Sequence, residues 1–301
     1  MLTGIFAGLA AGALWGLVFV APSLAPGLSA VDLMAGRFVS YGLGSLLVMA
    51  LSRGPRSVPT LKQAGMALGM SVLGFSGYYL LLVLAIRDAG VEVPTLIIGT
   101  IPIWIMLLGK PEGLLWRALL PGLCLTTSGV VLMMVAGVSQ PGADGQGAQD
   151  WTYWRGVGYA ILSMVSWTAF SLLNSVWLKK HREVKATDWA NWLGVASGLA
   201  ALVLWNALGS DSKVLLAQAD IAQAAIVCVA TGLGSAWLAT VLWNIASRRL
   251  SASLCGQLIV SETLFSLLYA FVWAGEWPAG IQWAASVMFV LGILVSIRAH
   301  R

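Results

Sequence analysis

Apolar residues recur along the chain in long runs that short polar segments interrupt. The runs are about as long as a helix must be to cross a hydrocarbon core of about 30 Å, which needs about 17–25 residues. No polar segment is long enough to form a separate soluble domain. The pattern therefore predicts an all-α integral membrane protein with ten transmembrane helices. We place these helices at residues 3–21, 29–51, 64–87, 91–109, 115–137, 155–178, 187–207, 219–246, 251–274 and 279–298.

The longest connection between predicted helices divides the chain into two halves. Residues 138–154 are rich in Gly, Gln and Asp, a composition typical of linkers, whereas the other connections are mostly short. We expect a first five-helix unit at 1–137 and a second at 155–301, joined by this linker on the periplasmic side.

The distribution of Lys and Arg predicts the orientation in the membrane, because short cytoplasmic loops carry an excess of both. If the N-terminus is cytoplasmic, only Arg87, Arg155 and Lys213 lie in outer loops. The inner segments then hold Arg53, Arg56, Lys62, Lys110, Arg117, Lys179, Lys180, Arg182, Lys185, Arg248, Arg249, Arg298 and Arg301. Both termini are therefore expected in the cytoplasm.

The two halves share a weak sequence similarity. A constant offset of 161 residues aligns the third and fourth predicted helices with the eighth and ninth, pairing Ala85 with Ala246 and Arg87 with Arg248. A repeat of five helices must insert its second copy in the opposite orientation. The sequence thus predicts two inverted repeats, a plan that places a transporter's solute site near the midplane between the halves.

The composition of the chain argues against several other classes of function. The chain is 59% apolar and 10% charged, so a soluble fold would expose a large apolar surface. The net charge of +5 is explained by the cytoplasmic loops, and no basic patch lies on a soluble module, so we expect no nucleic-acid partner. Cys124, Cys228 and Cys255 lie far apart in apolar segments without metal-binding spacing, which favours packing roles.

Motifs for catalysis are absent from the sequence. The two histidines, His181 and His300, lie in predicted cytoplasmic segments, and no HExxH or GxSxG motif occurs. We expect neither an enzyme nor a cofactor or metal site. A nucleotide-binding motif is also absent, so a gradient of the solute, or of protons through Glu262, would have to drive transport.

Charged residues at membrane depth are the strongest functional signal in the sequence. Glu262 lies halfway along the ninth helix, where burying a carboxylate costs several kcal/mol unless it faces a cavity or a partner. It can serve the solute or form a structural hydrogen bond between helices. For Arg37, two turns into the second helix, we favour a structural role, and Glu92 is expected at the membrane interface.

Polar and aromatic residues form stripes on several predicted helices. Their spacing of three or four residues places each stripe on one helix face, where the residues can either pack between helices or contact a solute. The candidate solute-binding residues are Trp15, Phe19, Tyr78, Tyr79, Ser163, Trp167, Ser171, Asn174, Trp237, Thr240, Asn244, Gln257, Ser261 and Glu262. Their aromatic rings suit an aromatic or apolar solute, or a cation held over ring faces. Glycines spaced by four, at Gly8-Gly12-Gly16 and Gly65-Gly69, permit close helix packing.

The chain resembles the EamA type of the drug/metabolite transporter superfamily over nearly its whole length. Residues 9–19 are similar to the first-helix signature, 160–180 to the sixth helix with its central Trp and basic end, and 246–253 and Gly275-Glu276 also fit. In the first half Lys110 stands where the family has Glu, so the inner end of helix 4 departs from the pattern. Within the superfamily the chain is most similar to YddG-type exporters of aromatic amino acids.

The resemblance implies a specific fold and activity. It implies two inverted five-helix repeats around a cavity lined mainly by helices 1, 3, 4, 6, 8 and 9, with helices 5 and 10 at the flank. It implies export of amino acids, preferably aromatic, or related small organic solutes across a bacterial inner membrane by alternating access. The alternatives are an exporter of organic cations with Glu262 as the counter-charge, and a channel or lipid-handling membrane enzyme.

Overall fold

The computed structural model describes residues 1–52, 58–89, 94, 97–138, 151–218, 220–275 and 277–300. Within these residues the chain forms helices and their connections and contains no β-strand. Eight helices are long and apolar enough to cross a membrane, and the N-terminal helix is a shorter apolar helix. The protein is therefore a multi-pass, all-α membrane protein, as the hydrophobic pattern predicts.

The helices follow the predicted order. The first half contains α1 (Leu2–Gly16), η1 (Leu17–Phe19), α2 (Ala21–Leu24), α3 (Ala30–Leu51), α4 (Leu61–Ser71), η2 (Val72–Ser76), α5 (Gly77–Ala89), α7 (Ile101–Leu108) and α8 (Trp116–Val138). The second half contains α9 (Trp151–Lys180), α10 (Ala186–Leu208), α11 (Ser212–Leu216), α12 (Ile221–Ala230), η3 (Thr231–Leu238), α13 (Ala239–Arg249), α14 (Ala252–Ala274) and α15 (Gly280–Ala299).

The start of the second half and the fourth helix differ from the prediction. The linker is predicted to end at 154, whereas α9 begins at Trp151, because the aromatic residues after Asp150 continue the helix. The fourth helix is predicted at 91–109, and its last part is α7. Residues 90–93, 95 and 96 lie outside the described residues, as does most of the predicted linker.

Local sequence signals explain several helix ends. Ser29 and Ser251 are N-caps whose side chains accept hydrogen bonds from the first turns of α3 and α14. Thr60 and Gln63 form a reciprocal capping box at the start of α4. At the end of α14, Gly275 takes φ of 68°, a left-handed conformation that glycine adopts without strain.

A π-helical segment interrupts each of two membrane helices at corresponding places. η2 lies between α4 and α5, and η3 lies between α12 and α13, each in continuous helix. Shifting η2 by the predicted offset of 161 residues places it within η3. π-Segments are rare and occur often at functional sites.

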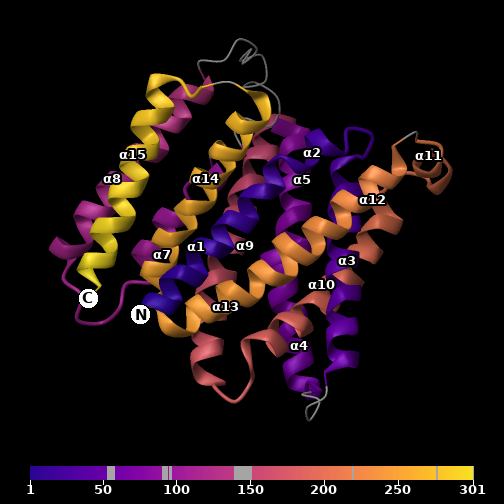
Figure 1. Ribbon diagram of the computed structural model, residues 1–301, viewed down its shortest axis with the longest axis horizontal. Helices are drawn as coiled ribbons and strands as arrows, with labels where there is room; N and C mark the ends of the chain where they lie inside the picture. The colour runs from indigo at the N-terminus through magenta and orange to yellow at the C-terminus, as the bar shows by residue number, and fades with distance from the viewer. Residues whose placement is uncertain are drawn as a thin grey trace.

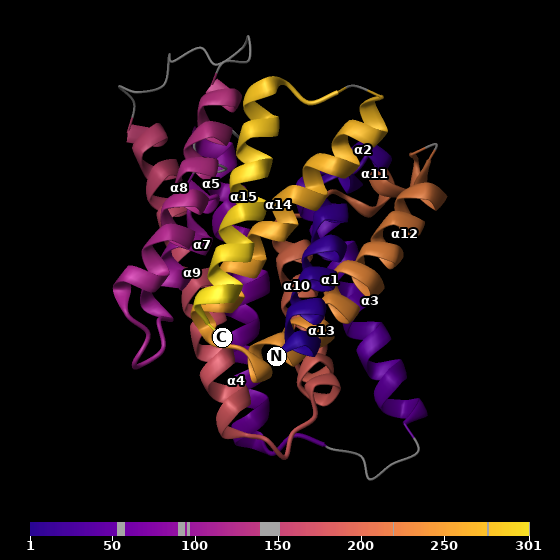
Figure 2. The same ribbon diagram turned by 60° about the vertical axis from the view of Figure 1, so that its left-hand side comes forward.

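The main helix contacts join one half of the chain to the other. α3 packs along α10, α8 along α15, and α5 along α9, while α1 packs on α13 and α14, and α7 on α14. Figures 1 and 2 show α8 and α15 side by side at the flank of the bundle.

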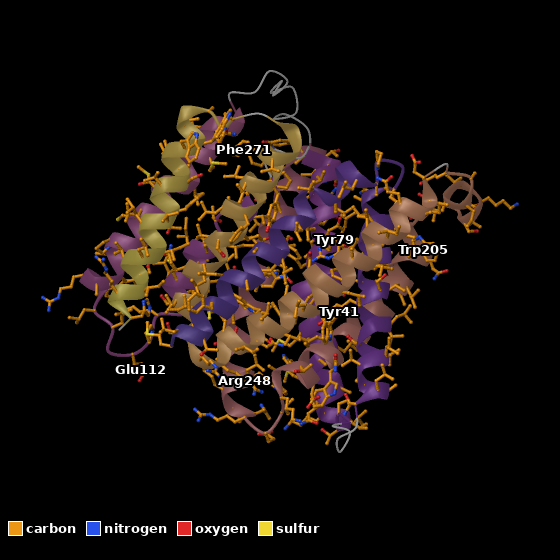
Figure 3. All side chains as sticks on the ribbon, in the orientation of Figure 1. Tyr41, Tyr79, Glu112, Trp205, Arg248 and Phe271 are labelled. Atoms are coloured by element: carbon orange, nitrogen blue, oxygen red, sulfur yellow. The ribbon has the colours of Figure 1, made fainter. Side chains whose placement is uncertain are left out.

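Both termini lie at the same end of the bundle (Figures 1 and 2). Glu112, in the connection before α8, and Arg248, near the end of α13, also point to this end (Figure 3). The connections that the charge distribution assigns to the cytoplasm therefore share one end of the molecule.

Candidate functional site

A continuous series of aromatic rings connects six helical segments of the bundle. It runs from α13 through α1, α9, η2 and α3 to α5. Successive ring centroids are 5.3 Å apart for Trp243 and Trp15, 6.2 Å for Trp15 and Trp167, 6.2 Å for Trp167 and Phe170, 5.4 Å for Phe170 and Phe75, 5.9 Å for Phe75 and Phe38, and 6.5 Å for Phe38 and Tyr79. These separations lie within the favourable range for aromatic pairs. The series brings together three predicted site residues, Trp15, Trp167 and Tyr79.

Not every ring of the series is fully packed. Trp15, Trp167 and Tyr79 are partly exposed, whereas Trp243 is 1% exposed and Phe170 is 3% exposed. The buried rings therefore support the partly exposed ones, and part of the ring surface of Trp15, Trp167 and Tyr79 is not covered by protein.

Polar groups surround the α3–α5 end of the series. The hydroxyl of Tyr79 donates a hydrogen bond to the Ala30 carbonyl at 3.1 Å. The guanidinium of Arg37 lies 5.4 Å from the centre of the Phe38 ring, and its Nη2 donates to the Ser235 carbonyl at 3.2 Å. Arg37 is thus held by α3 and η3 at the place where the aromatic series ends (Figure 3 labels Tyr79 there).

Glu262 lies near the middle of α14 and interacts electrostatically with Arg37 and with Tyr78 of α5. Its backbone passes directly over α1, because atoms of Glu262 lie 3.1 Å from a side-chain carbon built at Gly12 and 3.2 Å from one at Gly16. Both Glu262 and Tyr78 are partly exposed. The structure therefore brings a carboxylate, a guanidinium and two phenols together from three helices.

Asn174 and Asn244, two other predicted site residues, are fully buried in a hydrogen-bond network. The side-chain amide of Asn174 donates to Asn244 at 3.2 Å and its oxygen accepts from the Trp189 indole at 2.7 Å. Asn244 also donates to the Ala186 carbonyl. These bonds join α9, α10 and α13 and occupy groups that a solute would otherwise use.

Most of the remaining predicted residues also make contacts between helices. Ser163 donates to the Tyr78 carbonyl at 3.0 Å and the Trp237 indole to Asn191 at 2.7 Å. Ser171 and Thr240 are 2% and 1% exposed.

Gln257 and Ser261 lie on α14 but point to different neighbours. The amide of Gln257 donates to Thr126 of α8 at 2.7 Å, and its oxygen accepts from Ser296 of α15 at 3.1 Å. Ser261 bonds to the Leu258 carbonyl and faces Gly12 of α1. Gln257 therefore attaches the flanking pair α8–α15 to α14.

Two sequence-based predictions cannot be placed. The side chain of Phe19 and the whole of Glu92 lie outside the described residues.

Arg37, Trp243, Phe75 and Phe170 were not among the predicted site residues. Arg37 carried a visible signal, because an arginine two turns inside an apolar helix is costly and needs a partner. The aromatic residues had no such signal, since rings spaced along apolar helices are indistinguishable from ordinary packing residues.

No group of His, Cys, Asp and Glu suited to a metal ion occurs in the part of the chain that the structure describes. Among the described residues, ion pairs join Asp88 to Arg87 at 3.1 Å and to Arg155 at 2.8 Å. The second pair connects the end of α5 to the start of α9 and includes no residue of the polar cluster around Glu262.

Comparison with known proteins shows what the chain is similar to. Residues 154–298 match the EamA-like transporter family. The chain is 28% identical to the inner membrane protein YtfF of Escherichia coli (strain K12) over 312 residues, covering 99% of this chain and 96% of that protein. A solved structure titled only "Crystal structure of protein" has the same fold, with a TM-score of 0.77 at 20% identity over 99% of this chain and 97% of that chain. The second half of the chain therefore resembles EamA-like transporters, and the whole chain resembles an inner membrane protein and shares the fold of a solved structure.

Proposed function

We propose that the protein is a secondary transporter that exports amino acids, preferably aromatic ones, across a bacterial inner membrane by alternating access. The observation that carries this proposal is the aromatic series with partly exposed rings that ends at Arg37, close to Glu262. Rings of this kind bind an aromatic side chain, and the charges bind the polar end of the same solute. The resemblance of the sequence to YddG-type exporters of aromatic amino acids supports the proposed substrate.

The proposal includes an inverted repeat of five helices, ten in all. The paired π-segments η2 and η3 support it, and so do the helix contacts. In such a repeat, each contact between the halves has a counterpart formed by the equivalent helices of the opposite halves. The α5–α9 contact corresponds in this way to the contact between α13 and α1, and the α7–α9 contact to that between α14 and α1. Helices broken at corresponding places in two repeats often surround the transport site.

The transport assay uses purified protein in liposomes loaded with unlabelled tryptophan. We expect saturable counterflow uptake of labelled phenylalanine, because a carrier exchanges solute through one alternating site. Competition by other zwitterionic amino acids, and not by quaternary ammonium ions, would favour an amino-acid exporter over an organic-cation exporter. Uptake without counterflow would indicate a channel, and absence of uptake for every amino acid would overturn the proposed substrate.

The inner-membrane orientation is tested by labelling. In a variant without Cys124, Cys228 and Cys255, a cysteine placed at Arg182 should resist a membrane-impermeant thiol reagent in intact cells. The reason is that Arg182 belongs to the basic connection between α9 and α10, which we assign to the cytoplasm. A cysteine at Lys213, in α11, should react readily. Rapid labelling at 182 in sealed cells would reverse the orientation.

Trp167→Ala tests the aromatic series. We expect the half-saturation concentration for phenylalanine to rise about 10-fold, since a lost aromatic contact of about 1.4 kcal/mol corresponds to that factor. Trp283→Ala is the matched control, because Trp283 lies on the flanking helix α15 and is 51% exposed. Equal kinetics for both variants and the unmodified protein, at equal insertion, would make the series a packing feature.

A further inference from the structure

Only some of the N–H groups of the Arg37 guanidinium have a hydrogen-bond partner. It occupies the second turn of α3, and Nη2 bonds to Ser235. Its Nε is buried without a hydrogen-bond partner. A guanidinium carries five N–H donors, and burying a charged donor without an acceptor is costly. The group therefore lacks an acceptor that a carboxylate oxygen can supply.

The opposite charge is near Arg37 but is not bonded to it. Arg37 and Glu262 interact electrostatically, yet within the described ranges the direct ion pairs are those of Asp88. Their helices also pack in different groups, because α14 packs on α1, α7 and α15, whereas α3 packs on α10, α12 and η3. The two charges are therefore close enough to interact but form no direct ion pair.

Glu262 and Tyr78 carry polar groups that no neighbouring side chain among the described residues occupies. Neither side chain takes part in a hydrogen bond between described residues, and neither has an oxygen among the buried atoms that lack a partner. Both residues lie in the middle of membrane helices and are of intermediate exposure. The unpaired carboxylate of Glu262 and the incompletely bonded guanidinium of Arg37 form two poles of opposite sign.

We infer that these poles recognise a zwitterion, with Arg37 binding the carboxylate of the solute and Glu262 its ammonium group. This inference rests on the proposed function and adds Arg37 to the site as the residue that selects for a free carboxylate. Arginine suits this role because its planar fork pairs with both oxygens of a carboxylate. The aromatic series then receives the side chain.

The two-pole site distinguishes three solutes that share one ring. Phenylalanine carries both charges, phenethylamine lacks the carboxylate, and 3-phenylpropionate lacks the ammonium group. The amine leaves Arg37 unpaired and the acid leaves Glu262 unpaired, so each should bind less well than the amino acid. A site that hydrogen-bonds a polar group rejects an analogue without it far more strongly than an apolar pocket does.

The experiment measures counterflow of the three labelled solutes in proteoliposomes. The unmodified protein should prefer phenylalanine over phenethylamine by at least about 10-fold. Arg37→Gln should reduce phenylalanine uptake to about the level of phenethylamine, while phenethylamine uptake stays the same or rises, because a repelling cation has been removed. Arg87→Gln is the matched control, since this arginine is 63% exposed near the end of α5.

The results separate the inference from the proposed function. If the unmodified protein transports none of the three, the proposed function fails. If it transports phenylalanine but Arg37→Gln lowers phenylalanine and phenethylamine uptake equally, the inference alone is overturned.

A second measurement does not depend on the folding of a variant. Phenylalanine should raise the unfolding temperature of the detergent-purified, unmodified protein more than either analogue does, because binding stabilises the folded state. Equal stabilisation by phenylalanine and phenethylamine would also overturn the inference.

Discussion

Replacing Glu262 by glutamine should abolish most transport of aromatic amino acids while the protein still inserts and folds. Glutamine keeps the shape of the side chain and removes its charge, and a neutral amide is less costly to bury than a carboxylate. A hydrogen bond to a charged group is worth about 1.5–3 kcal/mol. We therefore expect the transport efficiency for phenylalanine to fall by about 10- to 100-fold.

The same variant tests whether Glu262 exchanges protons with the solute. If it does, transport by the unmodified protein depends on pH between about 5.5 and 8, and the residual transport of Glu262→Gln does not. Uptake into proteoliposomes across this range gives both curves.

Glu112→Gln is the matched control for Glu262→Gln. Glu112 is an exposed glutamate in the connection before α8, at the end of the bundle that carries both termini (Figure 3). It should behave like the unmodified protein. Overlapping curves for Glu262→Gln and the unmodified protein would remove Glu262 from the mechanism and make it a structural hydrogen-bonding group.

Replacing Gly16 by alanine should destabilise the protein and impair transport. A side-chain carbon at this position would lie 2.9 Å from the backbone nitrogen of Ser266 and 3.2 Å from the carbonyl oxygen of Glu262. Backbone atoms cannot rotate away, so α1 and α14 must separate, and Glu262 moves with α14. Overpacking of this kind costs about 1–3 kcal/mol.

Gly69→Ala is the matched control, and it should stabilise the protein instead of destabilising it. No atom lies within 4 Å of a side-chain carbon built at Gly69 on α4. Alanine there removes the cost of glycine in a helix, about 1 kcal/mol, without a clash. Unfolding temperatures in detergent, with phenylalanine counterflow, measure both variants. A Gly16→Ala protein as stable and active as Gly69→Ala would show that the α1–α14 contact is not tight.

These two glycines illustrate the limit of a sequence pattern. The spacing Gly8-Gly12-Gly16 and the spacing Gly65-Gly69 are the same and predict close packing equally. In the structure the first stripe lies against α13 and α14, whereas Gly65 and Gly69 have open space around them. The pattern shows that a backbone can be approached closely, but a second helix has to be there, and its position depends on the whole bundle.

The polar residues of α14 show the same limit. Gln257 and Glu262 are both polar positions on one predicted helix and both were predicted to bind the solute. In the structure Gln257 is enclosed by Thr126 and Ser296, while Glu262 remains partly exposed and interacts with Arg37. Whether Gln257 also touches the solute stays a prediction. A polar residue in an apolar helix must find a partner, but the sequence does not say which neighbour supplies it.

The sequence by itself determined the membrane class, the order of the described helices and many of their ends. These properties depend on hydrophobic length and on capping residues close along the chain, such as Ser29 and Ser251, so local chemistry decides them. It also marked Arg37 and Glu262 as costly charges. Only the tertiary structure brought them near one another, connected the rings from Trp243 to Tyr79, and enclosed Asn174 and Asn244. Those relations join residues far apart in sequence, and the packing of helices from both halves creates them.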